Sequence, residues 1–234
     1  APGGAFSEGF VKSAVMIGAN EIGDKTFFIA AVMAMTQSRA RVFAGAVGAL
    51  AVMTALSAAF GWAVGELSEM TGGGAAATDA VAALLFFYFG ARMLADAWGA
   101  SGELQELAEV EEELRQGSDK SGASKVPGGT LGSLASALGL GVVFVRAFSL
   151  TFLAEWGDRS QLATITLAAD SDPLGVTLGG VVGHALCTGL AVLGGRAFAS
   201  AISERVVLLA GGALFLLFGA QSALEAYSSY LAPN

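Results

Sequence analysis

The chain has 234 residues and a formal net charge of −8, with 54% of its residues hydrophobic and only 14% charged. A soluble domain carries roughly a quarter of its residues as charges, so this composition excludes an ordinary soluble domain and indicates a membrane protein in contact with the lipid bilayer. The single cysteine, Cys187, excludes a disulfide framework, and the lack of a basic patch with interleaved aromatic residues predicts no nucleic-acid partner.

Six segments are apolar enough to cross a bilayer as helices, which takes about 20 residues each. In chain order they are Phe10–Met35, Val42–Val64, Ala80–Ala97, Leu138–Ala168, Leu174–Ala197 and Val206–Ala226. The first and the fourth contain several charged residues, and the other four contain fewer. Pairs of glycines four residues apart, Gly61 with Gly65 and Gly179 with Gly183, predict close approach of neighbouring helices.

A polar stretch separates the third segment from the fourth. It divides the chain into a first three-helix repeat at 1–100, an acidic linker at 101–129 and a second three-helix repeat at 130–234. Six glutamates predict a solvated acidic helix in the linker, with a regulatory or cation-attracting role as the alternative; they are Glu103, Glu106, Glu109, Glu111, Glu112 and Glu113.

The loop charges predict an orientation, because Lys and Arg favour the cytoplasmic side. Lys12 stands alone on one side of the predicted bundle. The opposite side carries seven basic residues: Arg39, Arg41, Arg115, Lys120, Lys125, Arg196 and Arg205. The central linker is therefore expected to be cytoplasmic, with both ends of the chain on the opposite side.

The two halves repeat each other. Three patterns recur in the same order: Glu21–Thr26 returns as Glu155–Ser160, Gly45–Gly48 as Gly180–Gly183, and Phe86–Gly90 as Phe215–Gly219. A unit with an odd number of spans must insert its second copy upside down. The predicted fold is therefore an all-α membrane protein, with six transmembrane helices arranged as two inverted three-helix repeats.

The first pattern carries four acids inside hydrophobic spans. On a continuous helix, Glu21 and Asp24 share a face, and Glu21 adjoins Lys25. The second copy repeats this arrangement, with the acids Glu155 and Asp158 and the basic residue Arg159. One ionised side chain at the bilayer centre costs about 2.5–3.5 kcal/mol, so these groups are expected to face each other or a water-filled cavity near the midplane.

The chemistry of this predicted site favours a hard divalent cation. Four carboxylates opposed by Lys25 and Arg159 leave two negative charges, which one divalent cation or two protons would neutralise. Beyond the four acids, the oxygen donors are Asn20, Thr26, Ser160 and Gln161, a set that suits calcium, manganese or magnesium. No bound cofactor is expected, since the metal is the transported substrate.

Several local questions stay open at this level. Gly23 and Gly157 lie between the acids, and either could let the helix unwind or make room for a neighbour. The acids could instead form intrahelical ion pairs that only neutralise charge. His184 in the fifth span suits a packing role or a proton relay, and Arg146 has no assigned role.

The duplicated pattern Glu-x-Gly-Asp-(Lys/Arg)-(Thr/Ser) resembles the signature of the Gdt family of calcium/manganese–proton antiporters of the Golgi, chloroplasts and cyanobacteria. The resemblance extends to Gly183-His184, to Cys187-Thr188 and to the acidic linker. It implies exchange of Ca²⁺ or Mn²⁺ for protons, with the four motif acids as candidate ligands or proton carriers and Thr26, Ser160 and Gln161 as supporting residues. The second motif and the linker look closer to secretory-pathway members, such as those of the Golgi, than to chloroplast ones.

Two other functions compete with secondary antiport. A divalent cation channel would use the same ligands, although an internal inverted repeat suits alternating access better. A remote alternative is an intramembrane aspartyl protease in which Asp24 and Asp158 share a proton. Each aspartate is preceded by a glutamate and followed by a base, which suits ion binding better.

Overall fold

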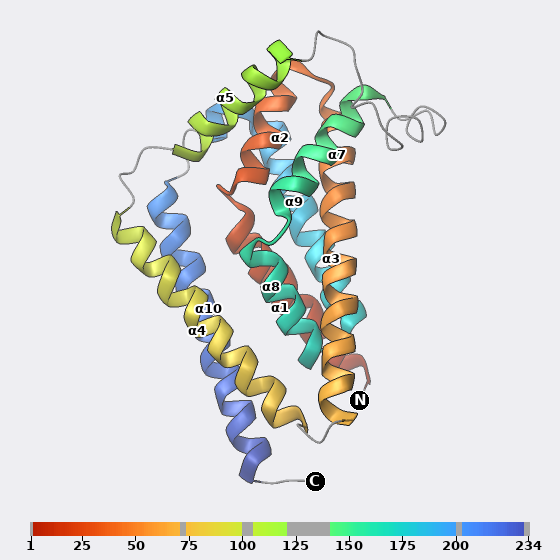
Figure 1. Ribbon diagram of the computed structural model, residues 1–234, viewed down its shortest axis with the longest axis vertical. Coiled ribbons are helices and arrows are strands. Elements are labelled where there is room, and N and C mark those ends of the chain that lie inside the picture. Colours follow the sequence, from red (N-terminus) through yellow and green to blue (C-terminus); the bar gives the residue numbers. More distant parts are fainter. Residues whose placement is uncertain (1, 71–73, 100–104, 121–140, 200–202, 232–234) are drawn as a thin grey trace.

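The computed structural model describes residues 2–70, 74–99, 105–120, 141–199 and 203–231. All regular structure within these residues is helical (Figure 1). The helices are α1 (Pro2–Glu21), α2 (Lys25–Thr36), α3 (Arg39–Met70), α4 (Gly74–Gly99), α5 (Gln105–Lys120), α7 (Val142–Glu155), α8 (Arg159–Asp170), α9 (Pro173–Ala199) and α10 (Glu204–Leu231). Residues 138–140 of the predicted fourth span, and Glu103 and Lys125 of the predicted linker, lie outside the described residues.

Four of the helices are long and apolar enough to cross a membrane, and they match the second, third, fifth and sixth predicted spans. They contain Arg39–Ser68, Ala76–Gly99, Pro173–Gly195 and Arg205–Leu231. The first and fourth predicted spans are not single helices. Each is divided into two shorter helices, α1 with α2 and α7 with α8, so neither of these two spans is one continuous helix.

Glycine causes both breaks. Gly23 and Gly157 each have a φ of 84°, a conformation that residues with a Cβ rarely adopt. A Cβ on Gly157 would meet nothing within 4 Å, so the backbone conformation and not lack of space calls for glycine there. Of the two readings left open by the sequence, unwinding of the helix is the one observed.

The two halves of the chain pack across each other. Helix α3 of the first half lies against α7 and α8 of the second, and α9 of the second half lies against α1 and α2 of the first. Gly61 and Gly65 allow α3 to touch the backbone of α8 at Ile165 and Ala169, and Gly179 allows α9 to touch the backbone of α1 at Phe10. The predicted close helix contacts at these glycines are confirmed.

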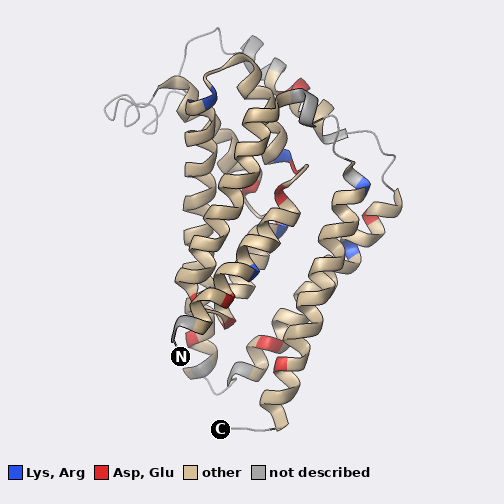
Figure 2. Cartoon of the chain, turned by 180° about the vertical axis from the view of Figure 1, so that it is seen from behind, with Lys and Arg blue, Asp and Glu red and all other residues tan. Residues whose placement is uncertain are grey.

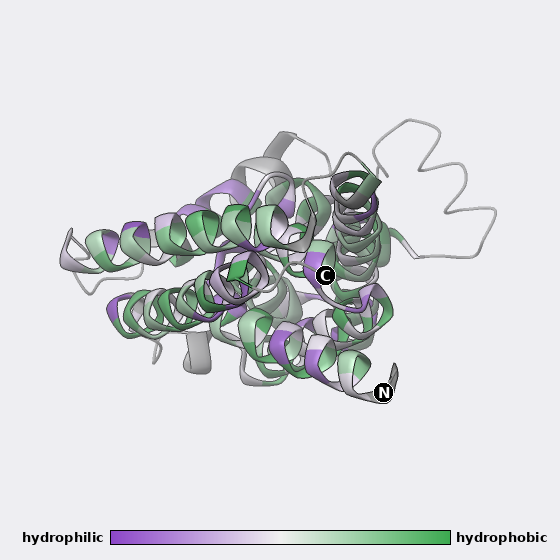
Figure 3. Cartoon of the chain, turned by 90° about the horizontal axis from the view of Figure 1, so that it is seen from below, coloured by the Kyte–Doolittle hydropathy of each residue, from purple (hydrophilic) through white to green (hydrophobic). Residues whose placement is uncertain are grey.

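Helices α4 and α10 form a pair, called here the α4–α10 pair, that packs mainly on itself and is inclined to the remaining helices (Figure 1). Phe86 and Phe215 meet in its core, with ring centroids 5.8 Å apart. Hydrophobic residues predominate along these helices when the molecule is viewed from below (Figure 3). The pair contacts the rest of the molecule mainly through α1, α3 and α8.

Helix α5 lies across one end of the molecule, called here the linker side (Figure 1). Its residues Leu107 and Val110 are buried against the core around α2, whereas Glu112 and Glu113 are exposed. The acidic linker helix is thus amphipathic and not fully solvated. Helix α1 begins and α10 ends at the opposite end, called here the terminal side.

Candidate cation site

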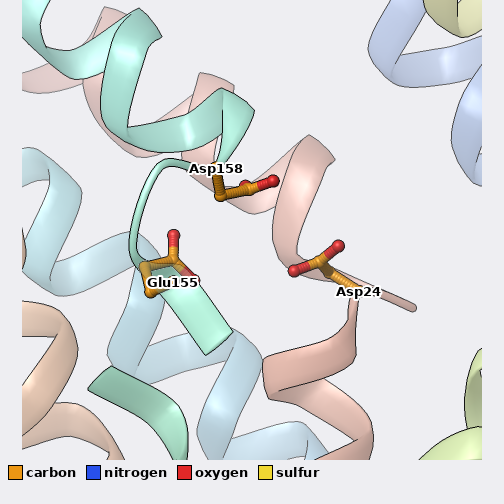
Figure 4. Close-up of side chains that lie close together, drawn as sticks. All are labelled: Asp24, Glu155 and Asp158. Atoms are coloured by element: carbon orange, nitrogen blue, oxygen red, sulfur yellow. The ribbon is translucent and has the colours of Figure 1, made fainter. Parts of the chain in front are cut away.

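Three of the four predicted acids converge where the two helix breaks face each other. Carboxylate oxygens of Asp24, Glu155 and Asp158 all lie within 4.8 Å of one another. Asp24 comes from the break between α1 and α2, and the other two acids flank the break between α7 and α8 (Figure 4). Residues from opposite halves of the chain therefore build one group, called here the motif cluster.

Glu155 is the most deeply buried member of the motif cluster, with 2% of its surface exposed. Its Oε1 accepts a short hydrogen bond from the Ser160 hydroxyl. Its Oε2 is buried and has no hydrogen-bond partner among the described residues. A buried carboxylate oxygen without a partner carries a substantial desolvation penalty, which a proton or a cation would relieve.

Glu21 lies beside the motif cluster in a separate hydrogen-bonded group. Its Oε2 accepts a hydrogen bond of 3.0 Å from Thr26 Oγ1 and lies 3.5 Å from Nδ1 of His184. Both Glu21 and His184 are buried. The sequence singled out His184 only as a packing or relay residue, and the structure places it against a motif acid.

The basic residues of the two motifs are placed differently. Arg159 extends between two acids, with Nη2 3.6 Å from Asp24 Oδ1 and Nε 3.9 Å from Asp158 Oδ1. Lys25 turns to α5 instead, and its Nζ lies 2.8 Å from Glu113 Oε1. The expected adjacency of Glu21 and Lys25 is wrong, because the break at Gly23 places the two residues on different helices.

Asp24 and Asp158 each occupy the N-cap position of the second helix fragment, with ψ of 167° in both. Asp158 Oδ2 accepts a hydrogen bond of 3.1 Å from the Ser160 backbone N–H. The sequence-based view that each Glu–Asp pair shares one helical face is therefore wrong. The broken helices bring together carboxylates, helix C-termini and helix N-termini, as in the discontinuous helices of secondary transporters.

The remaining supporting residues predicted from the sequence have local roles. Asn20 Nδ2 donates a 2.7 Å hydrogen bond to the Met16 carbonyl, leaving its buried Oδ1 without a partner among the described residues. Gln161 Oε1 accepts a 2.8 Å hydrogen bond from the Gly157 N–H and so holds the second break. Arg146, which had no assigned role, donates to the Leu114 carbonyl of α5 at 3.4 Å.

A polar cavity of about 320 Å³ opens beside the motif cluster. Asn20, Gly23, Asp24 and Arg159 line one wall, and the α4–α10 pair supplies the other with Arg92, Asp96, Val207 and Leu208. Arg92 and Asp96 form an ion pair of 3.1 Å. The sequence analysis missed their place beside the site, although two opposite charges four residues apart in an apolar span were the available signal.

Comparison with known proteins identifies the family. The profile of a family described as "Divalent cation/proton antiporter GDT1" matches residues 9–101 and 143–230. The chain belongs to this family. The two matched stretches contain one motif each, and they correspond to the two halves that the sequence repeats suggest.

Named relatives match this chain over most of its length. It is 48% identical to GDT1-like protein 5 of Arabidopsis thaliana over 94% of this chain and 97% of the relative. GDT1-like protein 5 of Oryza sativa subsp. japonica is 46% identical over 93% and 94%, and GDT1-like protein 3 of Arabidopsis thaliana is 44% identical over 88% and 67%. No solved structure matches the chain significantly.

Membership of the GDT1 family settles the class of activity. The protein is a multi-pass membrane antiporter whose transported substrates are divalent cations and protons. It belongs to a transporter family and is not an enzyme, so the aspartyl protease alternative is wrong. The resemblance found in the sequence is confirmed.

Proposed function

We propose that this GDT1 protein exchanges Ca²⁺ or Mn²⁺ for protons at the motif cluster, with Asp24, Glu155 and Asp158 as the cation ligands and Glu21 as an adjoining acid. The observation that carries this proposal is the buried, unpartnered Oε2 of Glu155, close to two further carboxylates. Asn20, Thr26, Lys25, Arg159, Ser160 and Gln161 are proposed as supporting residues.

The charges of the motif cluster support a divalent cation. Three carboxylates and the guanidinium of Arg159 carry two excess negative charges within this group. One divalent cation or two protons would neutralise them, so cation binding and proton binding exclude each other. The donors are all oxygens, which suits Ca²⁺ and Mn²⁺ better than softer metals.

The arrangement of the helices supports six crossings in two inverted repeats. The broken pairs α1–α2 and α7–α8 run in opposite directions along the molecule, as do α3 and α9, and α4 and α10 (Figure 1). In this topology the linker side is cytoplasmic, because Arg39 and Arg41 at the start of α3 and Arg205 at the start of α10 lie on that side. A Golgi or other secretory-pathway membrane is the proposed location, with a chloroplast membrane as the alternative.

Transport by the full chain in proteoliposomes tests the site. Mn²⁺ or Ca²⁺ uptake, followed with a trapped indicator dye, should accelerate when the lumen is acidic, and pyranine inside the vesicles should report proton exit. Glu155→Gln removes the charge but keeps the shape of the side chain, and it should stop both fluxes. Glu66→Gln, an exposed acid on α3 far from the motif in the sequence, is the matched control and should transport normally.

Two results would contradict the proposal. Cation uptake indifferent to an imposed pH gradient would favour a channel over exchange. Normal exchange by a folded Glu155→Gln protein would remove the motif cluster as the transport site while leaving the family assignment intact.

A further inference from the structure

A second group of acidic side chains gathers on the terminal side, away from both motifs. Carboxylate oxygens of Asp79 in α4, Asp170 at the end of α8 and Glu225 in α10 lie within 4.8 Å of one another. Acidic residues are visible near this end of the molecule in Figure 2. These three acids, called here the terminal cluster, come from three helices and share no sequence pattern.

Asp79 shows that the terminal cluster is more than a group of solvated charges. Only 3% of this residue is exposed, and its Oδ1 has no hydrogen-bond partner among the described residues. The Asp79 carboxylate lies close to those of two other acids, and burying it there is costly unless something positive lies between them. A cation held between the three carboxylates would relieve this cost.

The nearby base balances only part of this charge. Lys12 Nζ lies 3.9 Å from Glu225 but 2.7 Å from Glu8, so the lysine is shared with a further acid. Gln221 donates a 2.9 Å hydrogen bond to Glu225 Oε1. Both contacts hold Glu225 in place, and neither reaches the free oxygen of Asp79.

A small cavity meets the terminal cluster at Asp170. It measures about 10 Å³, and its polar lining includes Lys12, Thr166, Asp170, Gln221 and Ser222. A volume of this order is close to what a single water molecule needs. Asp170 lines the cavity and Asp79 and Glu225 do not, so the space suits a water molecule beside the cluster.

We propose that Asp79, Asp170 and Glu225 form a second site for a divalent cation of the hard, oxygen-preferring class. The bound ion would join the α4–α10 pair to α8 on the terminal side, whereas the polar cavity at the motif cluster separates the pair from α1 and α8 nearer the linker side. Binding at the terminal cluster does not depend on the proposed exchange at the motif cluster.

Counting bound Mn²⁺ tests this second site directly. The full chain in nanodiscs is titrated with Mn²⁺, and the free ion is measured by electron paramagnetic resonance. Wild-type protein should bind two ions, Glu155→Gln one, Asp79→Asn one, and the double variant none. Asp79→Asn preserves the side-chain shape, and Glu225→Gln provides an independent second variant for the same loss.

The outcomes separate the two sites. If Asp79→Asn and Glu225→Gln, both folded by gel filtration, keep the wild-type count of bound Mn²⁺, the terminal site is overturned. One ion in the wild type that is lost in Glu155→Gln also overturns it, because the terminal cluster then holds only a shared proton. A count that falls in Asp79→Asn but not in Glu155→Gln upholds the terminal site and rejects the motif cluster as a metal site.

Discussion

One hydrogen bond determines which carboxylate oxygen of the buried Glu155 stays available to a cation. The Ser160 hydroxyl binds one oxygen of Glu155 and leaves the other oxygen free. A donor of this kind stabilises the ionised carboxylate in the form that binds metal. The pair therefore tunes the competition between cation and proton at the motif cluster.

Removing this donor should weaken cation binding. A hydrogen bond to a charged group contributes about 1.5–3 kcal/mol, so Ser160→Ala is expected to weaken Mn²⁺ binding roughly tenfold or more at neutral pH. Thr164→Ala is the control, since the Thr164 hydroxyl donates its hydrogen bond to the Ser160 carbonyl one turn away. Titration of both variants with Mn²⁺ measures the difference, and equal affinities would assign no such role to Ser160.

The acids of the site could be predicted from the sequence, but their partners could not. A repeated acidic motif inside apolar segments costs too much unless its copies meet, which is why all four motif acids were expected together. Asp24, Glu155 and Asp158 do meet, whereas Glu21 lies beside them with Thr26 and His184. The pairing of Lys25 with Glu113 and of Glu21 with His184 depends on helix breaks and on the docking of α5. The terminal cluster is formed by the fold alone, since Asp79, Asp170 and Glu225 are unrelated in sequence.

At the scale of elements, the two broken helices set the geometry of the site. Equal φ values at Gly23 and Gly157 place Asp24 and Asp158 at the starts of α2 and α8. The sequence shows that both glycines lie between a glutamate and an aspartate. A glycine in an apolar helix can either break the helix or allow a neighbouring helix to pack closely. Only the backbone conformation distinguishes the two uses.

Substitution of the second break glycine should perturb the site without creating a clash. Gly157→Ala forces a residue with a Cβ to a positive φ, which costs about 1–3 kcal/mol, and is expected to lower the melting temperature and the transport rate. Gly18→Ala is the control because this glycine lies within α1 and a Cβ there meets nothing within 4 Å. It should be neutral or slightly stabilising. Equal effects of the two substitutions on melting and transport would reject this role for Gly157.

Helix α5 is held by its apolar face more than by its ion pair. Exposed ion pairs contribute about 0–1 kcal/mol, and the side chains of Lys25 and Glu113 are 38% and 60% exposed. Val110, by contrast, is 1% exposed. Val110→Asp should release α5 and increase cleavage of the linker in limited proteolysis, while Glu113→Gln should leave cleavage nearly unchanged. If Glu113→Gln increased cleavage of the linker and Val110→Asp did not, the ion pair would be the main attachment of α5.

At the scale of the whole molecule, the α4–α10 pair stands apart from the motif cluster on the linker side and meets the other helices on the terminal side. The cavity lined by Val207 and Asp96 is therefore expected to admit water from the linker side only. The division of the chain into two repeats, with their helices in the same order, could be predicted from the recurring sequence patterns. The inclination of the pair could not, because it arises from packing between helices far apart in the sequence.

Cysteine labelling tests this accessibility. With Cys187→Ala as background, Val207→Cys in sealed vesicles should react with an impermeant thiol reagent supplied from the linker side and not from the terminal side. Leu217→Cys, at a 67% exposed position in the apolar middle of α10, should react from neither side. Ser228→Cys, exposed near the end of α10, should react only from the terminal side. Labelling of Val207→Cys from the terminal side would contradict the expected opening.

The crossed packing of the halves has a consequence for how such a protein can arise. Helix α3 finds its partners in α7 and α8, and α9 finds its partners in α1 and α2, so these two long helices pack mainly against the opposite half. An ancestor made of a single unit would have needed a second, oppositely inserted copy to complete its interface. Gene fusion would then have made permanent an association that previously depended on two separate polypeptides meeting in the membrane.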